Sequence, residues 1–188
     1  MPTGYQISDQ SAPYYLTFQV VNWIDIFTRK RYRDIFIDSL KFCQKEKKLE
    51  IYGYVIMSNH IHLIVRSEMD DLSSTVRDLK KYTSKHIVAS IDNPEESRRK
   101  WLLKLMEFEA QKRKNAGNYQ LWTYENHAIE LFSNNFIIEK LDYMHNNPVR
   151  AGIVEHPEEY RYSSARNYAG LESEIEIIEL SRNIERIN

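Results

Sequence analysis

The stretch "YVIMSNHIHLIVRS", residues 54–67, contains two apolar segments separated by a short polar turn. This pattern predicts a β-hairpin, because the Ser-Asn pair between the segments readily accepts the backbone angles of a turn. Side chains alternate between the two faces of a strand. The aliphatic face of the second strand consists of Ile61, Leu63 and Val65. We expect this face to meet the core, which leaves His60 and His62 on the opposite face.

The segments around this hairpin predict the rest of the fold. In order, we expect a strand at 14–21, a helix at 28–48, the hairpin strands at 50–57 and 60–66, a helix at 71–91, a strand within 119–131 and a helix at 133–147. This order indicates an α+β, ferredoxin-like split βαβ fold with an antiparallel sheet. Helices 28–48 and 71–91 should cover one face of the sheet, with helix 133–147 near the other. Pro148 is expected to end that last helix.

The length of 188 residues fits one domain, which we place at residues 1–170. Residues 92–118 are polar and charged around a short helical core, so they are expected to form a helical insertion. Residues 171–188 form an acidic C-terminal tail. Cys43 is the only cysteine, which excludes an intramolecular disulfide and a zinc–thiolate cluster.

The composition also restricts the location and partners of the protein. The first residues lack a signal-peptide pattern, and no apolar run reaches transmembrane length. We therefore expect a cytoplasmic protein with no membrane partner. Several short basic runs accompany 13 tyrosines and 7 phenylalanines. Such runs are most often solvated helix faces, although cations and aromatic rings together also suit a nucleic-acid partner.

Two histidines on one face of a strand suggest a metal site. His60 and His62 point the same way and can hold one divalent ion, although burial against backbone carbonyls is the commoner reason for such a pair. Tyr143 and Asn147 share one face of the last helix. A phenol is a potential nucleophile toward phosphorus, and an amide oxygen suits a hard cation. Packing of Tyr143 and helix capping by Asn147 are the alternatives, and His127 is a further candidate ligand or orienting group.

Three motifs, in order, give the chain a resemblance to a known family. They are "YGYVIMSNHIHLIVRS" (52–67), "LDYMHNNPVRAGIV" (141–154) and "EYRYSSARNYAG" (159–170). With them the chain resembles the HUH-type single-tyrosine transposases, in particular the REP-associated branch, over about residues 14–170. The resemblance implies that His60 and His62 bind Mg²⁺ or Mn²⁺, that Asn147 completes the metal site, and that Tyr143 is the nucleophile. Ser58 stands where many relatives have proline, which changes the turn and not the chemistry.

The same resemblance implies a reaction and a substrate. Tyr143 would cleave single-stranded DNA near a hairpin, form a covalent 5′-phosphotyrosine and allow the strands to be rejoined. Glu139, one helical turn earlier, is a candidate base, and the protein is expected to be a monomer or a homodimer. The basic residues proposed to guide the DNA are Lys80, Lys81, Lys85, Arg98, Arg99 and Lys100. The aromatic residues considered for stacking on bases, with core packing as the alternative, are Tyr82, Trp101 and Trp122.

Two other functions remain compatible with the sequence. One is a domesticated, non-catalytic DNA- or RNA-binding regulator on the same fold. The intact set of His60, His62, Tyr143 and Asn147 argues against it. The other is a metal-dependent hydrolase that uses the histidine pair with His127 and forms no covalent intermediate.

Overall fold

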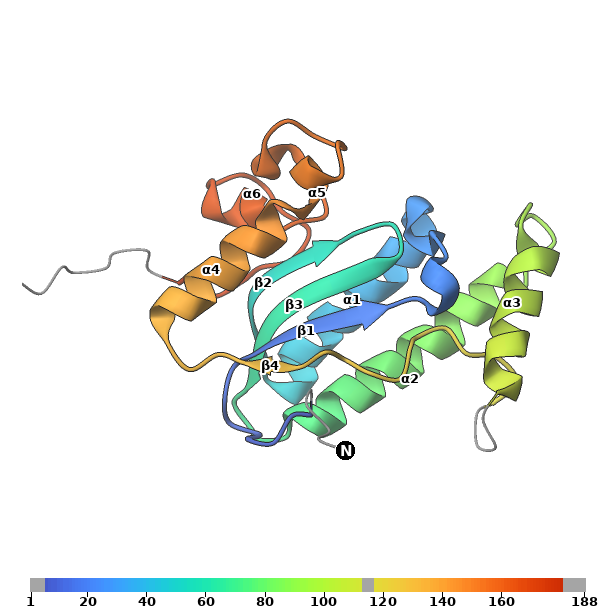
Figure 1. Ribbon diagram of the computed structural model, residues 1–188, viewed down its shortest axis with the longest axis horizontal. Coiled ribbons are helices and arrows are strands. Elements are labelled where there is room, and N and C mark those ends of the chain that lie inside the picture. Colours follow the sequence, from blue (N-terminus) through green and yellow to red (C-terminus); the bar gives the residue numbers. More distant parts are fainter. Residues whose placement is uncertain (1–5, 113–116, 181–188) are drawn as a thin grey trace, which may run out of the picture.

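A four-stranded antiparallel sheet forms the centre of the protein (Figure 1). The computed structural model describes residues 6–112 and 117–180. The strands are β1 (Tyr14–Gln19), β2 (Leu49–Ile56), β3 (His60–Ser67) and β4 (Ile129–Glu130), in the spatial order β2-β3-β1-β4. The helices are α1 (Lys30–Lys47), α2 (Leu72–Ile91), α3 (Arg99–Gln111), α4 (Asn134–His145), α5 (Asn147–Arg150) and α6 (Ala165–Tyr168). Short 3-10 turns are η1 (Val21–Trp23), η2 (Ile26–Thr28) and η3 (Pro157–Glu159).

The sequence of elements confirms the predicted α+β fold of the split βαβ type. β2 and β3 form the expected hairpin, and β3 also pairs with β1. The register of that second pairing places Thr17 opposite His62 and Gln19 opposite His60. The predicted division of β3 into two faces is confirmed as well. Ile61, Leu63 and Val65 belong to the larger apolar cluster, whereas His62 stacks on Tyr15 of the smaller cluster on the other face.

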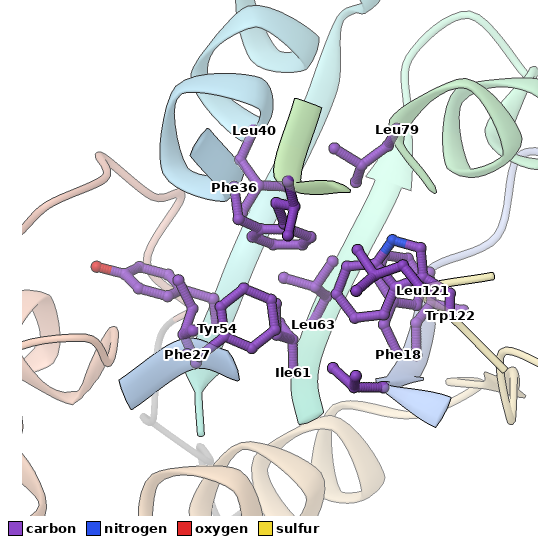
Figure 2. Packing of buried hydrophobic residues seen from close by; sticks show 14 of the residues in the cluster. Phe18, Phe27, Phe36, Leu40, Tyr54, Ile61, Leu63, Leu79, Leu121 and Trp122 are labelled. Carbon is purple, nitrogen blue, oxygen red and sulfur yellow. The ribbon is translucent and has the colours of Figure 1, made fainter. Parts of the chain in front are cut away.

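Helices α1 and α2 cover the aliphatic face of the sheet and enclose the larger core. Apolar residues recur along α1 at intervals of three and four positions, so that they line one side of the helix. Phe18 and Phe36 pack edge to face in this core, and Trp122 lies against both (Figure 2). The Trp122 indole is buried and donates a hydrogen bond to the Thr83 hydroxyl at 3.0 Å. Trp122 therefore packs in the core and does not present a surface for stacking on bases.

Helix α4 lies on the other face, over a smaller apolar cluster (Figure 1). Leu141 and Met144 of α4 pack there against Val55 and Ile64 of the hairpin. Gly53 permits this close approach, since a Cβ atom at that position would lie 2.5 Å from Met144 Cε and 2.6 Å from Leu141 Cδ1. The absence of a side chain on β2 therefore sets how closely α4 approaches the sheet.

We expect Gly53→Val to displace α4 and to lower the free energy of unfolding by about 1–3 kcal/mol, the usual cost of overpacking. Urea denaturation measures this change. Gly117→Val is the matched control, because a Cβ atom at Gly117 meets no atom within 4 Å and the backbone there needs no positive φ. Equal destabilisation by the two substitutions would show that Gly53 does not set the spacing.

Two predicted boundaries are wrong. The strand expected within 119–131 is reduced to the two residues of β4, and the chain before it runs irregularly beside β1. It is held there by a bridge between Val20 and Trp122 and by a hydrogen bond from Thr123 N–H to Gln19 O at 2.8 Å. The last long helix ends at His145, and Pro148 lies in the first turn of α5, which begins at Asn147, instead of stopping helical structure. A proline is tolerated in a first turn because its missing N–H is not needed there.

The C-terminal segment packs along the free edge of β2. Ser163 forms an isolated bridge with Val55, and the N–H of Ser164 donates to Tyr54 O at 2.9 Å. Ile175, within the predicted acidic tail, is buried in the larger core. Residues 113–116 of the predicted insertion and residues 181–188 of the tail lie outside the described residues. In the part of the chain that the structure describes, no helix has both the length and the apolar character needed to cross a membrane.

Candidate active site

The two histidines of β3 lie side by side on the face covered by α4. Their ring centroids are 4.8 Å apart. His62 is buried, whereas His60 is half-buried at the start of the strand. The i, i+2 spacing on one strand therefore places the two imidazoles together, as the sequence predicts.

Hydrogen bonds fix the orientation of both imidazole rings. Asn59 Oδ1 lies 2.7 Å from His60 Nδ1, and Asn59 Nδ2 donates to Trp23 O at 3.3 Å. The second bond sets the orientation of the amide, so its oxygen faces His60 and the imidazole donates from Nδ1. The hydroxyl of Thr17 lies 2.9 Å from His62 Nδ1. With Nδ1 engaged, the Nε2 atom of each ring remains available for another partner, as in metal-binding histidines with a second layer of partners.

Burial keeps both imidazoles neutral. It lowers the pKa of His60, and it lowers the pKa of His62 to about 3, with smaller contributions from His60 and Arg150. A neutral imidazole carries the nitrogen lone pair that a cation requires. The charge state of the pair therefore fits a metal site at neutral pH.

Tyr143 stands next to this pair at the exposed end of α4. Its ring centroid lies 6.4 Å from that of His62, and its side chain is 52% exposed. The guanidinium carbon of Arg150 lies 4.2 Å from the centre of the Tyr143 ring. Arg150 also donates to Tyr143 O at 2.9 Å. The structure thus brings the exposed phenol of Tyr143, the guanidinium group of Arg150 and the two neutral imidazoles together in one place.

Asn147, the third residue predicted to bind the metal, begins the short helix α5, four positions after Tyr143. Its Oδ1 accepts a hydrogen bond from Arg150 at 3.0 Å, and its buried Nδ2 has no hydrogen-bonding partner among the described residues. Within residues 6–112 and 117–180 there is no group of three or more His, Cys, Asp or Glu side chains suited to a metal. Imidazole nitrogens and a carboxamide oxygen are ligands that suit a divalent ion that keeps several waters, as Mg²⁺ does, and the role of Asn147 as a ligand stays a prediction.

Tyr15 is a site residue that the sequence did not reveal. Its ring stacks on His62 with centroids 5.2 Å apart, and its buried hydroxyl has no hydrogen-bonding partner of ordinary geometry among the described residues. Burial, and then Tyr143, raise the pKa of Tyr15. Tyr15 and Thr17 both alternate onto the histidine face of β1. That periodicity was available from the sequence, but the strand register that places them beside His62 was not.

The C-terminal end of α4 is held to the sheet by a further histidine, His145, which the sequence analysis did not single out. His145 Nε2 lies 2.7 Å from Ser164 Oγ, which also accepts a hydrogen bond from Tyr54 N–H at 2.9 Å. At the other end of α4, Ser133 caps the helix by accepting from Phe136 N–H. Because α4 is held to β2 close to Tyr143, the phenol has a defined position relative to the histidine pair.

The turn after β1 presents Trp23 at the edge of the site. The indole is 59% exposed and its centroid is 6.1 Å from that of His60. Asn22 and Trp23 have φ angles of 53° and 55°, in the left-handed region that residues other than glycine rarely adopt. Such residues cost on the order of 1–3 kcal/mol each. Local sequence patterns do not predict this conformation.

Two other candidate residues take less central positions. Glu139 lies one turn before Tyr143 on α4, with a side chain that is 70% exposed and 4.0 Å from Lys140. His127 belongs to the irregular segment before β4 and has a φ angle of 42°. Their roles as base and as ligand stay predictions.

The predicted DNA-binding residues lie on α2 and around the start of α3, away from the face that carries α4 (Figure 1). Lys80 is turned inward, where its ammonium group donates to Thr123 O at 2.9 Å and Asn126 Oδ1 at 2.6 Å. Arg98 pairs with Asp25, and Arg99 pairs with Asp92. Of the six predicted residues, the exposed ones are Lys81, Lys85 and Lys100. The structure does not bring this group of cations together with Tyr143.

Comparison with known proteins bears on the fold and on the family. A solved structure of a REP-associated tyrosine transposase bound to a REP hairpin is 18% identical, covers 98% of each chain and has a TM-score of 0.61. A putative transposase from Deinococcus radiodurans R1 is 15% identical over 78% of this chain and 95% of that one, with a TM-score of 0.42. No curated protein matches. The model of the family described as "Transposase IS200 like" matches residues 11–108, more than half of the chain. The predicted family is thereby confirmed, and the protein belongs to the IS200-like transposases.

Proposed function

We propose that this transposase cleaves and rejoins single-stranded DNA through a covalent 5′-phosphotyrosine formed on Tyr143. The observation that carries the proposal is the position of this half-exposed phenol, 6.4 Å from the ring of His62 between centroids. His62 and His60 both have their Nδ1 atoms engaged, so that their Nε2 atoms remain for a cation. A nucleophile beside a cation site is the arrangement that phosphoryl transfer requires.

His60, His62 and Asn147 are the residues that would hold Mg²⁺ or Mn²⁺. When bound, the ion supplies Lewis-acid polarisation of a non-bridging phosphate oxygen. The protein contributes the rest of the arrangement. Burial keeps the imidazoles neutral, Thr17 and Asn59 orient them, and Arg150 offers positive charge close to the phenol.

The proposed reaction exchanges one phosphoester bond for another. The phenolic oxygen of Tyr143 forms a bond to phosphorus and loses its proton, either to solvent or to Glu139 as the candidate base. The bond from phosphorus to the 3′ oxygen breaks, and that oxygen takes up a proton to become a free hydroxyl. Attack by a 3′ hydroxyl on the phosphotyrosine reverses these changes and rejoins the strand without a further energy source.

The substrate proposed is single-stranded DNA that carries a hairpin-forming repeat. Support comes from the family and from the similar fold of a REP-associated transposase that was solved with a REP hairpin. Because Tyr143 and His62 of the same chain already lie together, we further propose that one chain suffices for a complete site.

Tyr143→Phe is expected to abolish the covalent protein–DNA complex, because phenylalanine lacks the attacking oxygen. The assay incubates protein, Mn²⁺ and a labelled oligonucleotide carrying the repeats that flank the gene, followed by a denaturing gel. Wild type should give a shifted band that disappears on chelation. Tyr82→Phe is the matched control, since Tyr82 is 53% exposed and lies on α2, over the other face of the sheet.

Other results would assign a different function. Metal-dependent cutting that persists in Tyr143→Phe would identify a hydrolase without a covalent step. Tight binding of the flanking repeats without cutting by wild type would identify a non-catalytic regulator.

A further inference from the structure

Trp23 is an exposed aromatic residue whose position is fixed relative to the metal-binding candidates. Its ring lies nearly perpendicular to that of His60, with an interplanar angle of 80° and centroids 6.1 Å apart. The indole is 59% exposed, although a side chain of this size is usually largely buried. A large apolar surface is therefore left open beside the site where the scissile phosphate would bind.

The backbone of this turn is held in a rarely occupied conformation. Asn22 and Trp23 are consecutive residues with positive φ angles, and neither is glycine. The surroundings impose the conformation. The Trp23 N–H donates to Val20 O at 3.1 Å, and Asn22 Nδ2 donates to Glu109 Oε1 of α3 at 3.0 Å. Conformations of this kind persist where the structure over-determines them, and they concentrate at functional sites.

One side chain links the indole to the histidine pair. Asn59 donates to Trp23 O through Nδ2 and accepts from His60 Nδ1 through Oδ1. The two contacts belong to a single rigid amide group, so the turn that carries the indole and the ring of His60 are positioned together.

The other two tryptophans lie in different surroundings. Trp122 is buried in the larger core. Trp101 is 50% exposed but lies on the regular helix α3. Exposure alone therefore does not distinguish Trp23 from Trp101. What distinguishes Trp23 is its positive φ angle and the Asn59 amide that contacts both its carbonyl oxygen and His60.

We propose that Trp23 is the stacking platform for an unpaired nucleobase next to the phosphate that His60 and His62 serve. This inference rests on the proposed function, because it takes single-stranded DNA as the substrate. A base is separated from its phosphate by one sugar, so a ring beside His60 is suitably placed to receive it. Stacking on an aromatic face tolerates any base. Trp23 would thus hold the strand in register at the cleaved bond without selecting its sequence.

Equilibrium binding tests the proposal without strand cleavage. Tyr143→Phe protein is titrated into fluorescein-labelled oligonucleotides, one an oligothymidylate and one carrying the flanking repeat, and anisotropy reports the Kd. Adding Trp23→Ala should weaken binding of both oligonucleotides by about 5- to 140-fold, the range that corresponds to loss of one base–aromatic stack. Trp23→Phe should retain most of the affinity. Trp101→Ala, the matched exposed tryptophan, should leave the Kd unchanged.

An abasic-site scan locates the stacked base. A single abasic nucleotide is moved along the flanking-repeat oligonucleotide, and each Kd is measured with and without Trp23. One position adjacent to the cleaved phosphate should weaken binding when Trp23 is present. The same substitution should have no effect in Trp23→Ala, because the partner of that base is already absent.

Trp23→Gly separates binding from folding. Glycine adopts positive φ angles without strain, so this variant should unfold at the same temperature as wild type or higher while losing affinity as Trp23→Ala does. Unchanged Kd values for the Trp23 variants, or abasic effects that are the same with and without Trp23, would overturn the inference even if the covalent complex forms. The expected coupling in the absence of a covalent complex would overturn the proposed reaction and leave the stacking site standing. Failure of the Tyr143→Phe protein to bind either oligonucleotide would overturn both.

Discussion

Replacing His62 with alanine is expected to slow formation of the covalent protein–DNA complex by about 10²- to 10³-fold, the usual effect of removing one group that stabilises a transition state. His62 lies between Thr17, Tyr15 and Tyr143, and burial keeps its imidazole neutral. Its loss removes half of the nitrogen pair proposed for the cation. Single-turnover cleavage at saturating Mn²⁺ measures the rate, and anisotropy of fluorescein-labelled DNA in metal-free buffer checks that DNA still binds.

Thr17→Val gives the graded control for this substitution. Valine matches threonine in shape but cannot form a hydrogen bond with His62 Nδ1, so the ring loses its orientation and remains present. Loss of such a second-layer partner typically lowers metal affinity by about 10- to 100-fold. Higher Mn²⁺ should therefore rescue Thr17→Val and should not rescue His62→Ala. Full activity of His62→Ala in a chain that still melts cooperatively would contradict the assigned metal site.

Among the substitutions considered, replacing Glu96 with glutamine is expected to lower the free energy of unfolding most. Its carboxylate is buried and accepts hydrogen bonds from Tyr32 Oη at 2.7 Å and from the backbone N–H of Arg98 at 3.1 Å. Arg31 and Arg29 pair with the same group. Glu96→Gln would leave these cations without their counter-charge, and we expect the free energy of unfolding to fall by about 2–4 kcal/mol.

Urea denaturation at neutral pH measures that loss. Glu46→Gln is the control, because Glu46 is a partly exposed residue of α1 whose ion pair is with its neighbour Lys45 at 3.5 Å. Pairs of that kind contribute at most about 1 kcal/mol. Similar losses for the two variants would show that the segment before α3 does not depend on the Glu96 contacts.

The contribution of Glu96 to folding stability is expected to depend on pH. Burial alone would raise the pKa of Glu96, but hydrogen bonds from Tyr32, Arg98 N–H and Arg31 lower it to about 2 from an ordinary value of 4.5. A carboxylate with a lowered pKa in the folded state stabilises that state fully above its ordinary pKa. The stability advantage of wild type over Glu96→Gln should therefore shrink as the pH falls from about 4.5 toward 2.

The histidine pair illustrates what a local pattern predicts well. Alternation along a strand is a geometric rule, so the sequence alone placed the aliphatic residues of β3 on one face and His60 and His62 on the other. Helical spacing also predicted that Tyr143 and Asn147 share one face of a single helix, but the structure places Tyr143 on α4 and Asn147 at the start of α5. The pairing of Asn147 Oδ1 with Arg150 required the three-dimensional structure, because that contact depends on how α5 follows α4.

Residues that sequence analysis missed depend on contacts between distant segments. The fourth strand is short because Trp122 turns into the larger core and Lys80 bonds to the chain that follows it. The position of Trp23 depends on positive φ angles and on a hydrogen bond from Asn59, which lies 36 residues away along the chain. Charge counts likewise did not reveal that Arg98 and Arg99 are already paired with acidic residues.

The sheet has a different apolar cluster on each face, so the residues that stabilise the fold are largely separate from those that position α4. The larger cluster, under α1 and α2, contains most of the buried hydrophobic residues and so dominates folding stability (Figure 2). The smaller cluster, under α4, sets the position of the helix that carries Tyr143. Mutations on the exposed sides of α1, α2 and α3 can therefore accumulate over evolutionary time without moving Tyr143 relative to His62. Such a protein can acquire new surface properties on its helical side while its chemistry stays constant.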